Sequence, residues 1–180
     1  MSHGVLIIDD DVDVRRSARL VLASHDTRVE ELPTPQGLEV ILDQSRIEVV
    51  LLDMNFMAGA RDGAGGLDAL ARVRSIDPTL AVVLMTAYGG VNLAVESLKR
   101  GAVDFILKPW WNDKLLRAVT AAAEITRERR EAEVFELASV ERRTIERALE
   151  RFRGNISFTA AALGISRAAL YRRMAKHGLS

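Results

Sequence analysis

The 180-residue chain contains no cysteine, which excludes disulfide bonds, thiolate metal sites and cysteine nucleophiles. It has no stretch approaching the roughly 20 consecutive apolar residues that a membrane helix needs. No basic region precedes an apolar block near the N-terminus, as a secretion signal would require. We therefore expect a soluble cytoplasmic protein with no membrane partner. With 48% hydrophobic residues, the chain can form one large domain or two small ones.

The overall net charge of zero hides an asymmetry along the chain. Residues 1–123 carry 13 basic and 17 acidic side chains, and residues 124–138 carry 3 and 5. Residues 139–180 carry 9 basic and 3 acidic side chains, a net charge of +6. A basic C-terminal segment after an acidic body favours a polyanionic partner at that end.

Short apolar runs alternate with amphipathic helical patterns over the first 120 residues. The runs predict strands at 5–8, 27–32, 49–52, 80–84 and 103–107. The helical patterns lie near 12–24, 35–44, 66–76, 91–100 and from 112 onward. This alternation predicts an α/β doubly wound, five-stranded parallel sheet with helices on both faces.

The C-terminal part of the sequence reads as helical throughout. The pattern that begins at 112 continues through 124–138 and meets no breaker before Gly154. Residues 139–180 contain three short helical patterns separated at Gly154 and Gly164. The sequence therefore predicts a first domain at 1–123, a helical linker at 124–138 and a small all-α domain at 139–180.

Polar side chains follow the predicted strands at the points where each strand ends. They are Asp9, Asp10 and Asp11 after the first strand, Asp53 after the third, Thr86 (followed by Ala87) after the fourth, and Lys108 (followed by Pro109) after the fifth. Ligands of doubly wound sheets gather at the carboxyl ends of the strands, so these groups converge on one edge.

Crowded carboxylates repel one another, and a cation allows them to stay ionised together. Oxygen ligands of this kind favour a hard ion such as Mg²⁺, which also accepts phosphoryl oxygens. An aspartate can attack a phosphoryl group as a nucleophile, while a lysine and a hydroxyl stabilise the transferring oxygens. The pattern therefore predicts a phosphoryl-transfer site. Asp11 is better explained as the N-cap of the first helix.

Residues 1–123 resemble the receiver domain of bacterial response regulators over their whole length. The matching motifs are Ile-Ile-Asp9-Asp10, Leu-Leu-Asp53-Met-Asn55, Met-Thr86-Ala87 and Phe105-Ile-Leu-Lys108-Pro109. The resemblance implies that Asp53 accepts phosphate from a sensor histidine kinase. It implies that Mg²⁺ is bound by Asp9, Asp10, Asp53 and the backbone carbonyl of Asn55.

The same resemblance assigns the phosphate-stabilising and switch residues, which are Thr86, Ala87, Phe105, Lys108 and Pro109. Lys108 would pair with the phosphoryl group, and the Lys108–Pro109 peptide would be cis. The hydroxyl of Thr86 would move toward the phosphate while the ring of Phe105 turns inward. The protein would be no enzyme, apart from slow self-dephosphorylation.

The segment after Asp53 departs from the family pattern. It runs to Gly66 without the usual proline and is about five residues longer, which resembles regulators of the NtrC group, as does Leu107-Lys-Pro-Trp110. Of the neighbouring Trp110 and Trp111, we expect one to pack on the last receiver helix and the other to face solvent.

The C-terminal helices show the spacing of a helix-turn-helix. A small residue, Ala160, is followed four positions later by Gly164, which supplies the turn between two closely crossing helices. Ser166 is a good N-cap for the last helix. The expected DNA contacts are Ser166, Arg167, Ala168, Tyr171, Arg172, Arg173 and Lys176, with Arg167 and Tyr171 near base edges and the last three cations on phosphates.

Residues 139–179 resemble the Fis-type helix-turn-helix of NtrC-like activators. The match includes Arg153-Gly-Asn155, Ala160-Ala-x-Leu-Gly-Ile165 and Ser166-Arg-Ala-Ala-Leu-Tyr-Arg-Arg-Met. It implies a homodimer whose helix at 139–153 forms the interface and which binds a nearly palindromic double-stranded DNA site. His177 is assigned no catalytic or metal role.

NtrC-like activators normally carry an ATPase domain between these modules, and the sequence has no Gly-x-x-x-x-Gly-Lys-Ser/Thr motif. The chain is either a naturally short regulator, similar in layout to the Reg/Prr/Act-type regulators, or a derivative without its middle domain. The favoured function is a phosphorylation-gated transcription factor of a two-component phosphorelay. The alternatives are a phosphorelay or interaction protein whose tail only dimerises, and a hydrolase of haloacid-dehalogenase type. The hydrolase is disfavoured because Asn55 stands where a second catalytic aspartate is needed.

Overall fold

The computed structural model describes residues 4–25, 27–55, 64–87 and 91–179. The chain divides into two compact units, Met1–Arg130 and Glu131–Ser180. No helix within the described ranges is both long and apolar enough to cross a membrane.

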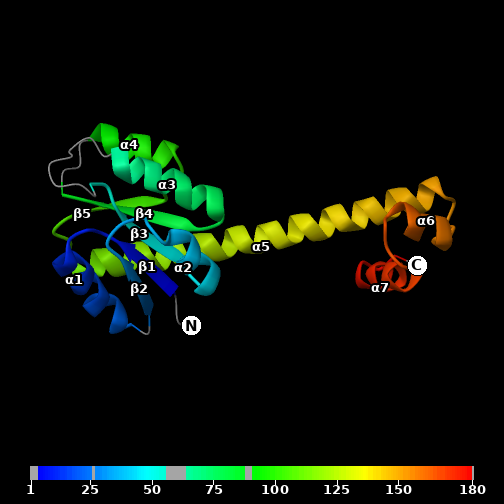
Figure 1. Cartoon of the computed structure of the whole chain (residues 1–180), viewed down its shortest axis with the longest axis horizontal. Helices are drawn as coiled ribbons and strands as arrows, with labels where there is room; N and C mark the ends of the chain where they lie inside the picture. Colours follow the sequence, from blue (N-terminus) through cyan, green and yellow to red (C-terminus); the bar gives the residue numbers. More distant parts are fainter. Residues whose placement is uncertain (1–3, 26, 56–63, 88–90, 180) are drawn as a thin grey trace. The chain divides into compact units, whose positions relative to one another are not determined.

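The first unit contains a five-stranded parallel sheet with the order β2-β1-β3-β4-β5 (Figure 1). Its strands are β1 (Gly4–Ile8), β2 (Arg28–Leu32), β3 (Val49–Asp53), β4 (Ala81–Thr86) and β5 (Asp104–Leu107). The helices between them are α1 (Val12–Ala23), α2 (Leu38–Gln44), α3 (Ala64–Ile76) and α4 (Val91–Lys99). This is the doubly wound α/β architecture that the sequence predicts.

The central strands are buried on both faces, as expected where crossover helices cover a parallel sheet. Alternate side chains of β1, β3 and β4 point into two separate cores. In one core, Val5 and Leu51 pack with Leu22 of α1 and Leu115 of α5 (Asn112–Arg151). In the other, Leu6 and Leu52 pack with helices α2 and α3, which lie on the opposite face of the sheet (Figure 1).

Strand register brings the carboxyl ends of the strands to one edge. Ile8 of β1 pairs with Leu52 of β3, and Asp53 pairs with Met85 of β4. Two backbone hydrogen bonds continue the ladder beyond the strands, from the Asp9 N–H to the Leu32 carbonyl and from the Lys108 N–H to the Thr86 carbonyl. The sheet therefore fixes where the polar residues after each strand begin.

Helix α5 (Asn112–Arg151) contributes residues to both units and covers the segment 124–138, which the sequence predicts to be helical. Within the first unit it is held at the opposite edge of the sheet. The fully buried Thr126 hydroxyl donates to the Glu48 carbonyl (2.6 Å) and accepts from the Ala81 N–H (2.8 Å). Four residues later, the Arg130 guanidinium contacts Asp77 at 3.0 Å.

The second unit is completed by α6 (Ile156–Ala162) and α7 (Arg167–Lys176). Its small core is formed by Ile145, Ala160, Leu170 and Met174, with Leu149, Ile156, Leu163, Ile165 and Leu179 packed around them. Gly164 has φ of 67°, a conformation that glycine adopts without a Cβ penalty, and it makes the turn between α6 and α7. The three helices, their two turns and the predicted cap at Ser166 are all present.

Most elements lie within one or two residues of their predicted bounds, and α2 differs most. The sequence pattern begins near residue 35, whereas the helix begins at Leu38. Gly37 has φ of 83°, so the chain is left-handed immediately before the helix and cannot start it earlier. The domain boundaries at 123 and 138 remain a prediction.

Candidate metal centre and nucleic-acid interface

Three aspartates meet at the carboxyl edge of the sheet in the first unit. The side chains of Asp9, Asp10 and Asp53 each offer a carboxylate oxygen, and these oxygens lie within 4.8 Å of one another. Asp9 is 0% exposed and Asp53 is 3% exposed, whereas Asp10 faces solvent. The two strand ends β1 and β3 bring these groups together because the strands are neighbours in the sheet.

Lys108 reaches the same cluster from the end of β5. Its ammonium lies 2.6 Å from Asp9 Oδ2 and 2.6 Å from Asp53 Oδ1. The Lys108–Pro109 peptide is cis, as the receiver resemblance implies. Burial lowers the pKa of Lys108, but the hydrogen bonds to Asp53 and Asp9 outweigh it, so the pKa lies above its ordinary value. Lys108 is therefore a permanent cation at this site.

The local negative charge exceeds what a single ammonium neutralises. Burial raises the pKa of Asp9, and the nearby Asp53 adds to the effect, against the opposing influence of Lys108. Three carboxylates face one ammonium, so a second cation would favour their ionised forms. A cluster of carboxylate oxygens of this kind could hold a hard divalent ion.

Asn55 adds two observations at this edge. Its backbone N–H donates to Asp53 Oδ2 at 2.7 Å, which fixes the rotamer of that carboxylate. Its side-chain Oδ1 is buried and has no hydrogen-bond partner among the described residues. A buried acceptor without a donor is costly unless a ligand or ion satisfies it. This orphaned oxygen fits a cation site, while the role of the Asn55 carbonyl as a ligand remains a prediction.

The predicted switch residues lie on the two neighbouring strands. Thr86 is the last residue of β4 and is 4% exposed, and Ala87 after it is exposed. Phe105 of β5 is partly buried against the core that contains Leu84, its register partner. Thr86 and Ala87 therefore lie at the predicted edge, whereas Phe105 is the second residue of β5 and lies further from it. The movements of Thr86 and Phe105 remain predictions.

Arg15 is a residue of the site that the sequence pattern did not single out. Its guanidinium Nη1 donates to the backbone carbonyl of Asp9 (2.6 Å) and to that of Asp10 (3.2 Å), and its Nε lies 3.6 Å from Glu31. Asp11 caps α1 through its side chain, as predicted. Helical side chains tilt toward the N-terminus, so an arginine one turn after the cap can reach back to the strand end. That spacing is the signal that could have found it.

The loop that begins after Asp53 is described only at its ends. Residues 56–63 lie outside the described residues, and with them most of the predicted insertion. Where the chain resumes, the Gly66 N–H donates to the Met54 carbonyl at 3.2 Å. A Cβ at Gly66 would lie 2.6 Å from the Met54 Cα, so the absence of a side chain permits this close approach beside Asp53.

Trp110 and Trp111 separate as the sequence predicts. Trp110 is partly buried against the core that includes α5, and Trp111 is 82% exposed.

In the second unit, the predicted DNA-contacting residues cluster on α7. Ser166 caps this helix through its hydroxyl oxygen, which accepts from the Ala169 N–H at 3.1 Å. Arg167, Ala168, Tyr171 and Arg172 are exposed, while Leu170 and Met174 on the other side of the helix are buried. The helix therefore presents a basic face with an aromatic ring to solvent, as a recognition helix does in the major groove.

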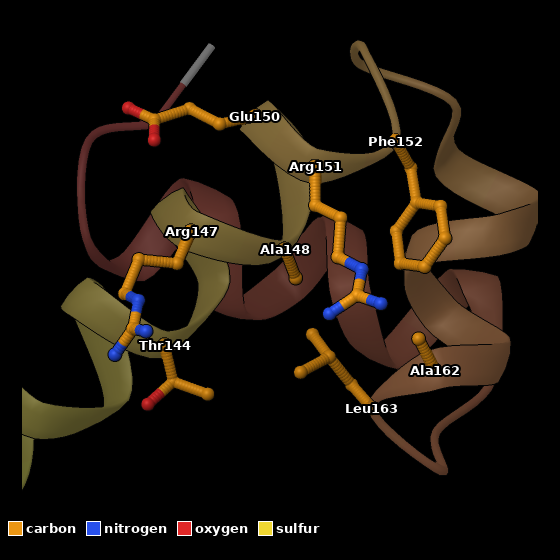
Figure 2. Close-up of a pocket in the computed structure, with 8 residues that line it drawn as sticks. All are labelled: Thr144, Arg147, Ala148, Glu150, Arg151, Phe152, Ala162 and Leu163. Carbon is orange, nitrogen blue, oxygen red and sulfur yellow. The ribbon is translucent and has the colours of Figure 1, made fainter.

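A hollow of about 780 Å³ opens on another part of the second unit. Figure 2 shows that α5 lines it with Thr144, Arg147 and Ala148, and α6 lines it with Ala162. Phe152 also borders the hollow and stacks on Phe158, with ring centroids 6.4 Å apart. Phe158 is 64% exposed, so an apolar surface flanks a rim of arginines.

The two units match two known protein families. Residues 5–120 match the response regulator receiver domain, and residues 136–177 match the bacterial regulatory proteins of the Fis family. The first match covers the carboxylate cluster and Lys108, and the second covers all three helices of the small unit.

Individual relatives agree with these matches. The chain is 33% identical over 138 residues to the C4-dicarboxylate transport transcriptional regulatory protein DctD of Pseudomonas aeruginosa, covering 77% of this chain and 29% of that protein. It is 31% identical to the chemotaxis protein CheY of Listeria monocytogenes, covering 67% of this chain and 98% of that protein. The chain thus spans less than a third of the longer regulator and nearly all of the shorter protein.

Solved structures show the same relationship. The crystal structure of NtrX from Brucella abortus in complex with ADP superposes with a TM-score of 0.67 at 29% identity, covering 82% of this chain and 34% of that one. A receiver domain from Bacteroides fragilis superposes with a TM-score of 0.61 at 39% identity, covering 68% and 98%. The chain therefore belongs to the response regulator receiver-domain family and carries a C-terminal segment of the Fis family of bacterial regulatory proteins.

Proposed function

We propose that this protein is a DNA-binding response regulator of a two-component system, phosphorylated on Asp53 by a sensor histidine kinase. The observation that carries the proposal is the contact of one ammonium, that of Lys108, with two buried carboxylates, Asp9 and Asp53. The Fis-family match of the basic C-terminal unit supports the DNA-binding half. We propose a cytoplasmic location, because a kinase partner and a DNA partner would both be met there.

The Asp53 carboxylate is prepared to act as the phosphoacceptor. One of its oxygens would form a bond to phosphorus as the bond from phosphorus to the kinase histidine nitrogen breaks. Asn55 holds Oδ2 from its backbone N–H, and Lys108 contacts Oδ1, so the carboxylate is oriented before the donor arrives. The Lys108 ammonium would then contact the phosphoryl oxygens and stabilise their negative charge. Self-dephosphorylation would be the only turnover.

Mg²⁺ is the ion that we assign to the cluster, held by Asp9, Asp10 and Asp53 with the carbonyl of Asn55. When bound, it would neutralise charge on the carboxylates and on the phosphoryl oxygens. Arg15 would keep the Asp9–Asp10 backbone in place through the two carbonyl contacts. Thr86 and Phe105 would then transmit phosphorylation along β4 and β5.

The second unit would bind DNA through the N-terminal half of α7. Arg167 and Tyr171 are exposed there and would reach base edges, with Ser166 and Ala168 close to the DNA. Arg172, Arg173 and Lys176 would contact phosphates.

We assign the hollow of the second unit to a second copy of the chain. It lies where α5 meets α6 and is bordered by Phe152, which stacks on Phe158. Upstream on α5, the apolar side chains of Leu137 and Val140 are also exposed. An Ala162→Glu variant places a charge in the hollow without touching the core and should give a monomer in analytical ultracentrifugation. Ala161→Glu, on the same exposed helix but away from the hollow, should remain a dimer.

The decisive experiment measures DNA binding with and without a phosphate mimic. Beryllofluoride with Mg²⁺ should tighten operator binding in wild type and have no effect in Asp53→Ala. Arg167→Ala and Tyr171→Ala should lose sequence preference. Equal DNA binding by wild type and the three variants, with and without the mimic, would contradict gating of DNA binding by phosphorylation. The alternative, a phosphorelay protein whose tail only dimerises, would then be favoured.

A further inference from the structure

One carboxylate in the second unit gathers three basic groups of α7 and its C-cap. Glu141 Oε1 lies 3.0 Å from Arg173 Nε, and Oε2 lies 3.3 Å from Lys176 Nζ. His177 Nε2 is 2.8 Å from Oε2, and this histidine side chain is only 8% exposed. Hydrogen bonds from His177 and Lys176 hold the pKa of Glu141 below its ordinary value, so the group is ionised at neutral pH.

Two of these three partners are cations that the proposed function places on DNA phosphates. Arg173 and Lys176 lie in the last turn of α7, whose basic surface is otherwise open. Among the described residues, Arg167 and Arg172 have no carboxylate within ion-pair distance. Of the four basic side chains on α7, the Glu141 carboxylate therefore pairs with Arg173 and Lys176.

Three contacts from Glu141 are more than is needed to hold the end of α7. The His177 contact alone would fasten the end of α7 to α5, because that side chain is nearly buried and sits at the C-cap. The pairs with Arg173 and Lys176 are partly exposed, with side chains 43% and 65% exposed, and exposed pairs add little to stability. Their larger effect is electrostatic, because one negative charge offsets cations that a polyanion would otherwise bind.

We propose that Glu141 is an intramolecular competitor of the DNA backbone, which occupies Arg173 and Lys176 and so limits the affinity of the recognition helix. The proposal rests on the DNA-binding function above and adds a residue that sets its strength. Phosphate oxygens and the Glu141 oxygens accept from the same donors, so DNA must displace the carboxylate or tolerate it nearby. Neutralising Glu141 makes both cations available to phosphates.

The test is Glu141→Gln, which keeps an oxygen that can accept from His177 and removes the charge. Each additional phosphate contact steepens the slope of log K against log salt by about 0.9, equivalent to about five-fold tighter binding near 0.15 M salt. We expect Glu141→Gln to gain between one and two such contacts per half-site. The probe is a labelled mixed-sequence duplex long enough for two half-sites one helical turn apart, titrated by fluorescence anisotropy at several salt concentrations.

Glu146→Gln is the matched control. Glu146 lies on the same helix and pairs with Arg142 at 2.9 Å, so this variant makes the same change in net charge without touching α7. It should show at most a small gain and an unchanged slope. In a background of Arg173→Gln and Lys176→Gln, the gain from Glu141→Gln should disappear, which a purely structural role of Glu141 does not predict.

The possible outcomes separate this inference from the proposed function. In the first outcome, wild type binds the duplex and Glu141→Gln binds no more tightly than Glu146→Gln at equal thermal stability. This result overturns only the role of Glu141. In the second outcome, neither wild type nor any variant binds the duplex at low salt. This result overturns the DNA-binding function and this inference together.

Discussion

Replacing Lys108 by methionine tests the charge balance at the proposed phosphorylation site. Methionine keeps much of the side-chain volume and removes the ammonium that contacts Asp9 and Asp53 at 2.6 Å each. Breaking a buried ion pair by removing one partner costs about 3–5 kcal/mol because the other charge stays buried. Lys108 is 16% exposed and water can reach it, so we expect the lower end, a loss of about 3 kcal/mol in the free energy of unfolding without metal.

The same substitution should strengthen metal binding. An ammonium and a dication that share the same carboxylates repel each other, by several kcal/mol at contact-range separations and an effective dielectric constant of about 20. Movement of the lysine relieves most of this repulsion, so we expect Mg²⁺ to bind Lys108→Met about ten-fold more tightly, or about 1.4 kcal/mol. The metal should then stabilise the variant more than wild type, following RT ln(1 + [Mg²⁺]/Kd).

Urea unfolding in EDTA and across a Mg²⁺ titration measures both quantities in one assay. Lys114→Met removes an exposed ammonium from the first turn of α5 and serves as the control, which should match wild type. Equal stabilisation of wild type and Lys108→Met by Mg²⁺ would refute the reasoning. It would mean that the metal and the ammonium do not act on the same carboxylates.

Three further predictions concern the surroundings of the site and the base of the sheet. Arg15→Met removes both contacts to the Asp9 and Asp10 carbonyls and should weaken Mg²⁺ binding about ten-fold in calorimetry, as loss of a supporting partner typically does; unchanged affinity would exclude a positioning role. Gly66→Ala places a Cβ 2.6 Å from the Met54 Cα and should destabilise the fold by about 1–3 kcal/mol and slow phosphorylation of Asp53 by acetyl phosphate; wild-type rates would contradict it. Burial raises the pKa of Asp77, but hydrogen bonds from Thr79 and Arg130 outweigh it and leave the pKa below its ordinary value. Asp77→Asn should therefore cost about 1 kcal/mol at neutral pH, and this difference from wild type should vanish as the pH falls through the folded-state pKa; a cost that persists in acid would assign it to packing instead.

The sequence predicts well those features that short-range patterns and strand order determine. Once the apolar runs are taken as parallel strands, Asp9, Asp53 and Lys108 must follow strand ends at one edge, and the structure brings their charged atoms together. The family match confirms the receiver and Fis-type assignments. The position of Gly37 explains why α2 begins later than its pattern.

Contacts that depend on side-chain direction or on packing between distant helices were not predictable in this way. Arg15 acts through the tilt of its side chain, which residue spacing shows only after the helix start is known. The Glu141–His177 contact joins residues 36 positions apart and depends on how α7 packs against α5. No periodicity in the sequence encodes that distance, and the sequence alone accordingly indicates no contact for His177.

Carboxylates hold cations at two places, around Lys108 and at Glu141, and the proposed function assigns the cations of both to phosphate groups. The two places differ in burial. Lys108 is held between Asp9 and Asp53, which are 0% and 3% exposed, whereas Glu141 keeps 31% of its side chain exposed. Salt screens exposed charges strongly and buried pairs weakly. The Lys108 contacts should therefore persist as ionic strength rises and yield only to a group that enters the pocket, such as a phosphoryl group. The Glu141 contacts should weaken gradually with salt, as DNA binding itself does. On the proposed function, the Glu141 site would therefore adjust DNA affinity continuously, whereas the aspartate pocket would change between two discrete states.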